Sequence, residues 1–260
     1  MRQRISNSVF SLITFVGLII VWYLATRVLN IATYILPGPR LVLKSFKLGF
    51  VDVWKEGDPL ASYGYYAPTL STLKSTFFGF VYGGFVGLLL GVLLAESTVF
   101  KRIFLPYASA FQAVPKIALA PLFIIWFGFG DFSHQMMAAT LVAFPLLITS
   151  MNALHVVDEE RIELARSYGA SRWTVLIRIK VPSALPEIFT GLELGVIYAL
   201  LGAIAAELVA GSDGIGARLM SQQTNNDIAG MFAMLIVSGA VGASLHFAMR
   251  MLRKRVVFWV

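Results

Sequence analysis

The spacing of apolar residues is the strongest constraint on this sequence, because six stretches are each long and apolar enough to cross a bilayer. A transmembrane helix needs about 20 consecutive, mostly apolar residues. The stretches are residues 9–28, 73–95, 103–129, 135–154, 188–210 and 228–252. Charged residues make up 13% of the chain, against roughly 25% in a soluble domain. The sequence therefore predicts an all-α protein, a polytopic membrane helical bundle with about six transmembrane helices.

Two of these stretches need comment. The first follows Arg2 and Arg4 as in a signal peptide, but no small-x-small cleavage site follows it, so we expect a retained span. The third contains Pro106, Pro115 and Pro121. Because proline removes a helical hydrogen bond and clashes with the preceding turn, this stretch should be bent or broken.

The basic residues predict an orientation. They concentrate at the N-terminus and in residues 101–102, 161–180 and 250–255, which places both termini in the cytoplasm by the positive-inside rule. The net charge of +7 thus indicates topology and no nucleic-acid partner. Most exceptions lie in the long external loop 30–72, where basic and apolar residues alternate over 40–50. This pattern predicts an amphipathic helix, either on the membrane surface or packed against the bundle.

The chain is accordingly divided into two parts. Residues 1–68 hold the first span and the external amphipathic segment, and residues 69–260 hold the core bundle. Within that core, the second stretch carries a glycine at every fourth position: Gly79, Gly83, Gly87 and Gly91. Such a ridge lets two helix backbones approach closely in lipid, so we predict a tight helix contact, within the chain or to a second copy.

The most charged segment, 158–182, joins the fourth and fifth stretches. Asp158 suits a helix N-terminus, Gly169 suits a helix end with positive φ, and Ser171 suits the start of a second helix. We expect that second helix to run to Ile179 and to be stopped by the prolines at 182 and 186. The apolar side chains of this segment indicate either a protein interface or a solvated connection.

The same segment resembles the EAA loop of bacterial ABC importer permeases. Glu163-Leu164-Ala165 occupies the Glu-Ala-Ala positions, Gly169 follows at the family spacing, and Ile179 precedes Val181-Pro182. Leu164 replaces an alanine and Val181 replaces a leucine of the family pattern. Residues 115–130, 182–186, 206–208 and 214–216 are similar to the nitrate, sulfonate and taurine group of these permeases.

This resemblance implies a type I ABC importer permease fold in the bacterial inner membrane. It implies a homodimer with a second copy, an ABC ATPase dimer and a soluble or lipid-anchored binding protein, and a small anionic cargo such as nitrate, a sulfonate or taurine. The sequence contains no phosphate-binding loop of the Walker type. ATP and Mg²⁺ would therefore be bound by the partner, and this chain would be no enzyme. The resemblance assigns ATPase coupling to Glu163, Leu164, Ala165, Gly169, Ala170, Ile179 and Pro182.

Candidate pathway residues come from the cost of placing ionisable groups in a membrane. Lys116, beside Pro115, could attract an anionic solute or could snorkel to the interface. Glu207 could gate the pathway or form a structural pair, Glu193 has no evident partner, and Gln112 could line the inner pathway. The three histidines have no metal-ligand spacing, so no metal site is predicted.

Two other readings remain. The same machinery could import a pyrimidine or an aromatic compound, since the group includes such permeases. An ion-driven secondary transporter is the other alternative, although the absence of an internal repeat and the EAA spacing disfavour it.

Overall fold

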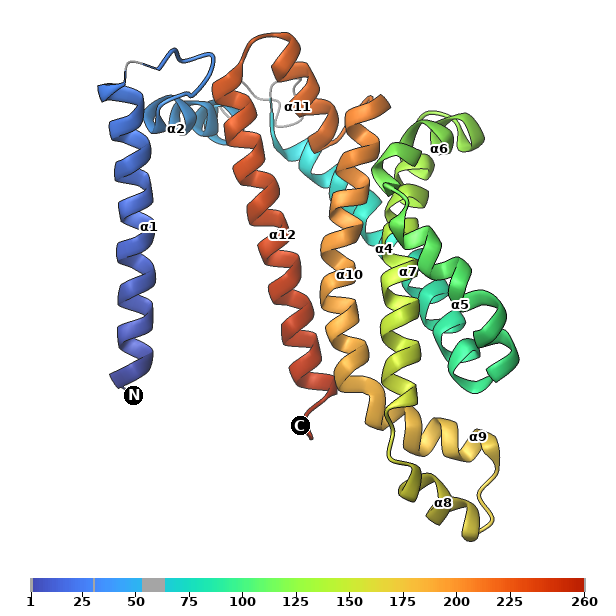
Figure 1. The fold of residues 1–260 in the computed structure, drawn as a ribbon. Helices are drawn as coiled ribbons and strands as arrows, with labels where there is room; N and C mark the ends of the chain where they lie inside the picture. The colour runs from blue at the N-terminus through green and yellow to red at the C-terminus, as the bar shows by residue number, and fades with distance from the viewer. Residues whose placement is uncertain (1, 30, 53–63, 260) are drawn as a thin grey trace. The chain divides into compact units, whose positions relative to one another are not determined.

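A computed structural model describes residues 2–29, 31–52 and 64–259, and every element in these ranges is helical (Figure 1). The elements are α1 (Arg2–Val28), α2 (Pro39–Lys47), η1 (Leu48–Asp52), α4 (Tyr66–Glu96), α5 (Thr98–Ala113), η2 (Lys116–Leu119), α6 (Ala120–Phe127), α7 (Asp131–His155), α8 (Glu159–Ser167), α9 (Arg172–Val175), η3 (Leu176–Lys180), α10 (Val181–Ala210), α11 (Ile215–Thr224) and α12 (Ile228–Val256). The chain forms two compact units. Unit 1 comprises residues 1–69 and 218–239, and unit 2 comprises residues 70–217 and 240–260.

The predicted all-α membrane bundle is confirmed. Among the described residues, four helices are long and apolar enough to cross a membrane: α4, α7, α12 and the continuous helix Arg172–Val209. The pair Thr98–Ala113 and Lys116–Phe127 would make a fifth, bent span. α1 covers the first predicted stretch, with an apolar part at Val16–Val28.

The third predicted stretch is broken, as its prolines indicate. α5 and the η2–α6 segment meet at an angle of 91°. The break lies at Val114, which is extended with ψ 131°, because the residue before a proline is disfavoured in a helix. Pro106 lies inside α5 without ending it, and the proline at position 121 falls in the first turn of α6, where its missing N–H is not needed.

The expectation that two prolines end the second helix of the segment 158–182 is wrong. α9, η3 and α10 form one continuous helix. Pro182 falls in the first turn of α10, and Pro186 lies inside that helix. The turn preceding them, η3, is π-helical. This wider turn leaves room for a proline ring and removes the conflict with the carbonyl of the preceding turn.

The core of unit 2 is built on α7. α10 packs along α7, and buried Val142, Leu146, Ala199 and Ala203 form part of the contact. The glycine ridge of α4 faces α7 as well. A Cβ atom at Gly83 would collide with the backbone of Ala139, so the ridge mediates a close backbone contact within the chain.

Unit 1 contains α1 and α2 and the segment 218–239. Trp22 of α1 donates a hydrogen bond from Nε1 to the Pro37 carbonyl at 3.1 Å, and its ring stacks on Phe232 at 6.3 Å. Buried Tyr65 packs edge-on against Phe50. Burial also raises the pKa of Tyr65. The predicted amphipathic helix is present as α2, and Val42 is its buried residue.

Candidate functional site

The charged segment after α7 folds into two short, capped helices. The Asp158 side chain accepts a hydrogen bond from the Glu160 N–H at 3.1 Å and so caps α8. At the other end, Gly169 has φ +78° and donates to the Arg166 carbonyl at 2.9 Å, while the Ala170 N–H donates to the Ala165 carbonyl at 3.1 Å. This pair of bonds is a Schellman motif, which requires a residue that accepts positive φ at its turn.

α8 presents two different faces. Glu163 and Arg166 line a hollow of about 320 Å³, whose other wall includes Leu154, His155 and Lys180 of the same chain. Leu164 and Tyr168 lie on the other side of the helix and are 61% and 85% exposed. Exposed large apolar side chains on a short polar helix are typical of a protein contact. Of the predicted coupling residues on α8, Glu163 thus lines the hollow, and Leu164 lies on the exposed apolar face.

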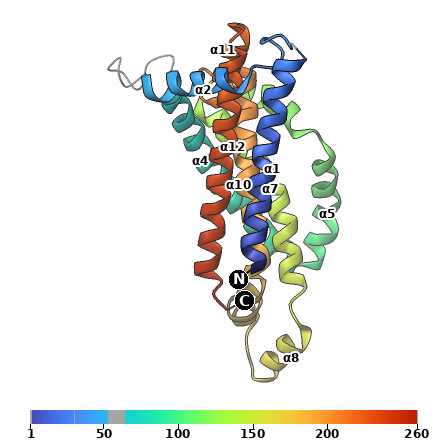
Figure 2. The ribbon, with the colours of Figure 1, turned by 90° about the vertical axis from the view of Figure 1, so that its left-hand side faces the viewer.

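The second half of the segment is joined firmly to the bundle. Ser171 caps α9 by accepting from the Thr174 N–H at 3.2 Å. Leu176 is buried with Leu154 of α7 and Ile188 of α10, and Ile179 is partly buried. Lys180 forms an ion pair with Glu96 at the end of α4. Pro182 does not interrupt the helix, so α9 continues through η3 into α10. In Figures 1 and 2, α8 lies at one end of unit 2, beyond the ends of α7 and α10.

A pocket of about 560 Å³ opens where α5 breaks into η2. Its polar lining comes from Gln112, Lys116, Thr149 and Tyr198. The remaining lining residues are Pro115, Ile117, Leu141, Pro145 and Ile148. The broken helix, the proline in α7 and the α10 tyrosine therefore meet around one space, and the predicted pathway residues Gln112, Pro115 and Lys116 all belong to it.

Lys116 also has a local structural role. Its Nζ donates to the Gln112 carbonyl at 3.2 Å, which lies in the last turn of α5. A cation at this position satisfies a free carbonyl and interacts favourably with the helix dipole. The Gln112 side chain in turn donates to the Phe144 carbonyl of α7 at 3.4 Å. Lys116 is thus held at the pocket by the helix end that it caps.

Buried Glu207, near the end of α10, forms hydrogen bonds with Thr72 and Gly216, and we call this group of contacts the Glu207 node. The Thr72 hydroxyl of α4 lies 2.8 and 2.9 Å from its two oxygens, and the Gly216 N–H donates to Oε2 at 2.9 Å. The Ile215 N–H donates to the Thr72 hydroxyl at 2.8 Å. A Cβ atom at Gly214, where φ is +106°, would overlap the carboxylate. The carboxylate therefore links the loop 211–214 and the first turn of α11 to α4.

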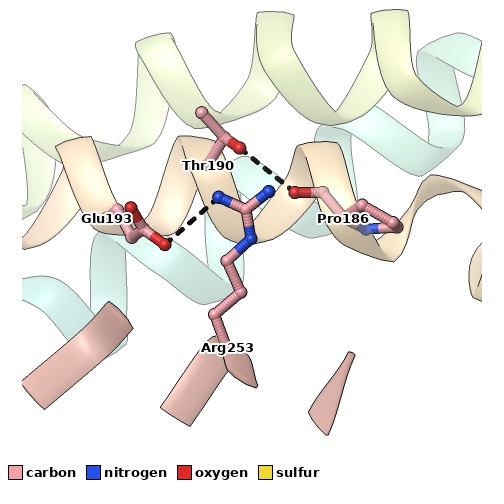
Figure 3. A network of polar contacts seen from close by, with 4 residues as sticks. All are labelled: Pro186, Thr190, Glu193 and Arg253. Atoms are coloured by element: carbon pink, nitrogen blue, oxygen red, sulfur yellow. Dashed lines mark hydrogen bonds and ion pairs between the residues drawn. The ribbon is translucent and has the colours of Figure 1, made fainter. Parts of the chain in front are cut away.

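Glu193 has a partner that the sequence did not reveal. Arg253 of α12 reaches its Oε1 at 3.3 Å (Figure 3). One turn earlier on α10, the Thr190 hydroxyl donates to the Pro186 carbonyl at 3.1 Å. The Glu193 side chain is largely buried, so the pair joins α10 to the last turn of α12 inside unit 2.

Comparisons with known proteins decide the family. Residues 85–258 match the family described as "Binding-protein-dependent transport system inner membrane component". The chain belongs to this family. It is therefore a multi-pass inner-membrane permease subunit of an ABC transporter, which excludes the ion-driven alternative.

Individual relatives support this assignment and differ in their named cargo. The chain is 32% identical to the riboflavin transport system permease RibX of Chloroflexus aurantiacus, over 95% of this chain and 88% of RibX. It is 31% identical to the putative aliphatic sulfonates transport permease SsuC of Bacillus subtilis, over 70% and 66% of the two chains. A structure of the MetNI methionine ABC transporter in an inward-facing conformation superposes with a TM-score of 0.65 at 20% identity, over 72% of this chain and 93% of that chain. This permease therefore has the type I fold.

The sequence missed several members of these sites for one reason. Thr72, Arg253 and Tyr198 are each distant in the chain from the residue or pocket that they complete. No spacing rule connects such positions. The apolar side chains of the charged segment, Leu164 and Tyr168 among them, were the sequence signal for the outward face of α8.

Proposed function

We propose that this permease, as a homodimer, forms the translocation pathway of an ATP-driven importer and docks through α8 onto a separate ABC ATPase. The observation that carries the proposal is the outward face of α8, where Leu164 and Tyr168 are exposed between two capped helix ends. ATP and Mg²⁺ bind to the ATPase, and this subunit does no chemistry. A binding protein delivers the solute from the outer side, and both termini lie in the cytoplasm.

The continuous helix Arg172–Val209 gives a mechanical route from the ATPase to the pocket. α8 is joined to α9 by the glycine turn, and α9 continues into α10 without a break. Tyr198 lies on α10 and lines the pocket. A shift of α8 when the ATPase dimer closes therefore moves a pocket wall directly, as expected when packed helices move as rigid elements.

The pocket favours a small anionic solute, such as a sulfonate, taurine or nitrate. Lys116 is the one charged residue among the nine residues that line the pocket, and Tyr198 carries the one aromatic ring. A flat aromatic solute would be better served by several stacking surfaces. Import of a pyrimidine or an aromatic compound remains the second candidate, because a relative named for riboflavin transport is similar over nearly the whole chain.

Uptake by the reconstituted permease, ATPase and binding protein tests this proposal. Radiolabelled taurine, an alkanesulfonate and a pyrimidine serve as probes. We expect uptake of an anion that depends on ATP, and Lys116→Gln should lower it about tenfold because one charged contact is worth roughly 1–2 kcal/mol. Lys116→Arg keeps both the charge and the α5 cap and should retain most uptake. Pyrimidine uptake that is insensitive to both changes would overturn the anionic assignment.

A further inference from the structure

A second cavity, separate from the pathway pocket, lies in unit 1 where α1 ends and α2 begins. Its volume is about 500 Å³, and its lining includes Arg27 from the last turn of α1 and Arg40 from the first turn of α2. Thr26 and Thr33 also line it. The cavity belongs to the part of the chain that precedes the family match at 85–258.

The two arginines are gathered around one ring. The Arg27 and Arg40 guanidinium carbons lie 5.9 and 6.0 Å from the centroid of Tyr23. None of the ten lining residues is acidic, and no carboxylate in the described ranges forms an ion pair with either arginine. Two positive charges that line one cavity, with no counter-charge among the residues that the structure describes, favour an anionic ligand.

The cavity is built into the fold and does not depend on mobile side chains alone. The Trp22 bond to the Pro37 carbonyl fixes the turn that returns the chain to α1. Gly38, which precedes α2, lies against Thr26, since a Cβ there would be in contact with its hydroxyl at 3.6 Å. α2 therefore begins beside the last turns of α1, and this placement puts Arg27 and Arg40 on the same cavity.

The surroundings identify the kind of anion. The apolar part of α1, Val16–Val28, ends at the cavity, and Trp22 and Tyr23 are residue types that concentrate at the membrane interface. Val28 and Tyr34 are strongly exposed beside it, which suits contact with acyl chains. A lipid phosphate lies at this depth in either leaflet, so the argument does not depend on orientation. Arginine is also the side chain best suited to bind phosphate through paired hydrogen bonds.

We propose that this cavity binds the phosphate group of an anionic phospholipid between Arg27 and Arg40. The site gives a role to Arg40, one of the basic residues of the 30–72 loop. It also gives the N-terminal part of the chain a function of its own, which is to anchor α1 and α2 to the headgroup layer.

Native mass spectrometry of the full-length chain, titrated with phosphatidylglycerol in mild detergent, tests the proposal. We expect one tightly held phosphatidylglycerol per chain. Arg27→Gln with Arg40→Gln should weaken its binding roughly thirty-fold, at about fivefold per interfacial charge. Lys44→Gln with Lys47→Gln removes the same charge from exposed positions of α2 outside the cavity and should change binding less than threefold. If the double arginine variant fails to fold, Arg40→Gln alone should weaken binding about fivefold.

Three outcomes would overturn the proposal. Equal loss in both double variants would mean that general surface charge attracts the lipid. Binding of glycerol phosphate as tight as that of the lipid would mean that the cavity takes a free anion. If the double arginine variant binds the lipid as tightly as the wild type but loses uptake with the binding protein, a carboxylate of a partner protein occupies the cavity.

Discussion

The coupling segment and the Glu207 node are stabilised in opposite ways. In the segment 158–171, each cap joins residues at most five positions apart, from Asp158 with Glu160 to Ala165 with Ala170. At the node, Glu207 and Thr72 are 135 residues apart, and Thr72 and Ile215 are 143 apart. One region is exposed and locally determined, whereas the other is buried and exists only in the folded bundle. A contact for a partner can thus be preformed locally, while the C-terminal end of α10 depends on its contacts with α4 and α11.

The largest effect is expected at the node. Glu207→Ala leaves the Gly216 N–H and the Thr72 hydroxyl without their acceptor in a buried site. The expected loss of stability is about 2–6 kcal/mol, at roughly 1–3 kcal/mol per unsatisfied group. Thermal unfolding in detergent measures it. Glu187→Ala, at an exposed position of the same helix, should change stability by no more than about 0.5 kcal/mol. Similar melting temperatures for the two variants would show that the node is not structural.

The contact between α4 and α7 is also long-range in the chain, and the neighbouring residues Gly83 and Gly84 allow a matched comparison there. Gly83→Ala puts a methyl group into the backbone of Ala139, whereas a methyl at Gly84 meets nothing within 4 Å. Overpacking should cost Gly83→Ala about 1–3 kcal/mol. Gly84→Ala should be neutral or stabilising by up to about 1 kcal/mol, because alanine is the better helix former. Thermal unfolding in detergent measures both variants. Equal changes in melting temperature for Gly83→Ala and Gly84→Ala would contradict the close contact between α4 and α7.

The local region should show a smaller and confined effect. Ser171→Ala removes the α9 cap and should cost about 1 kcal/mol. Hydrogen exchange should therefore speed up about fivefold at the first amides of α9 and remain unchanged in α7. Ser183→Ala, at an exposed position in the first turn of α10, is the matched control. Faster exchange throughout α7 would mean that the cap is coupled to the whole bundle.

The same contrast between local and long-range contacts explains which features could be predicted from the sequence. The all-α bundle, the break near Pro115 and the caps at Asp158, Gly169 and Ser171 follow from local periodicity and turn chemistry, and the described residues contain them. Of the six predicted spans, four are single helices long and apolar enough to cross a membrane, a fifth is the bent pair, and the first corresponds to the shorter apolar helix Val16–Val28. The continuous α9–α10 helix was missed, because the π-helical turn η3 precedes Pro182 and no sequence rule predicts such a turn, while Pro186 lies inside α10 without ending it. The partners of Glu193 and Glu207 were missed because they are chosen by tertiary packing. The prolines on either side of Lys116 were enough to predict that it lies at the pathway. Its hydrogen bond to the last turn of α5 could be seen only from the geometry of the helix break.

The central claim is that α8 transmits ATPase motion to the pathway, and substitutions at Gly169 test it most directly. A Cβ atom at this position meets nothing within 4 Å, so only the backbone angle of +78° restricts the residue. Asparagine accepts this angle, whereas a β-branched residue is strained by more than about 1–2 kcal/mol. Gly169→Asn should therefore retain most ATP-dependent uptake in proteoliposomes. Gly169→Val should abolish uptake although the chain still inserts, because the strain falls on the turn between α8 and α9 and leaves the packing of α7 against α10 in place. Uptake by Gly169→Val at the wild-type rate would contradict the account.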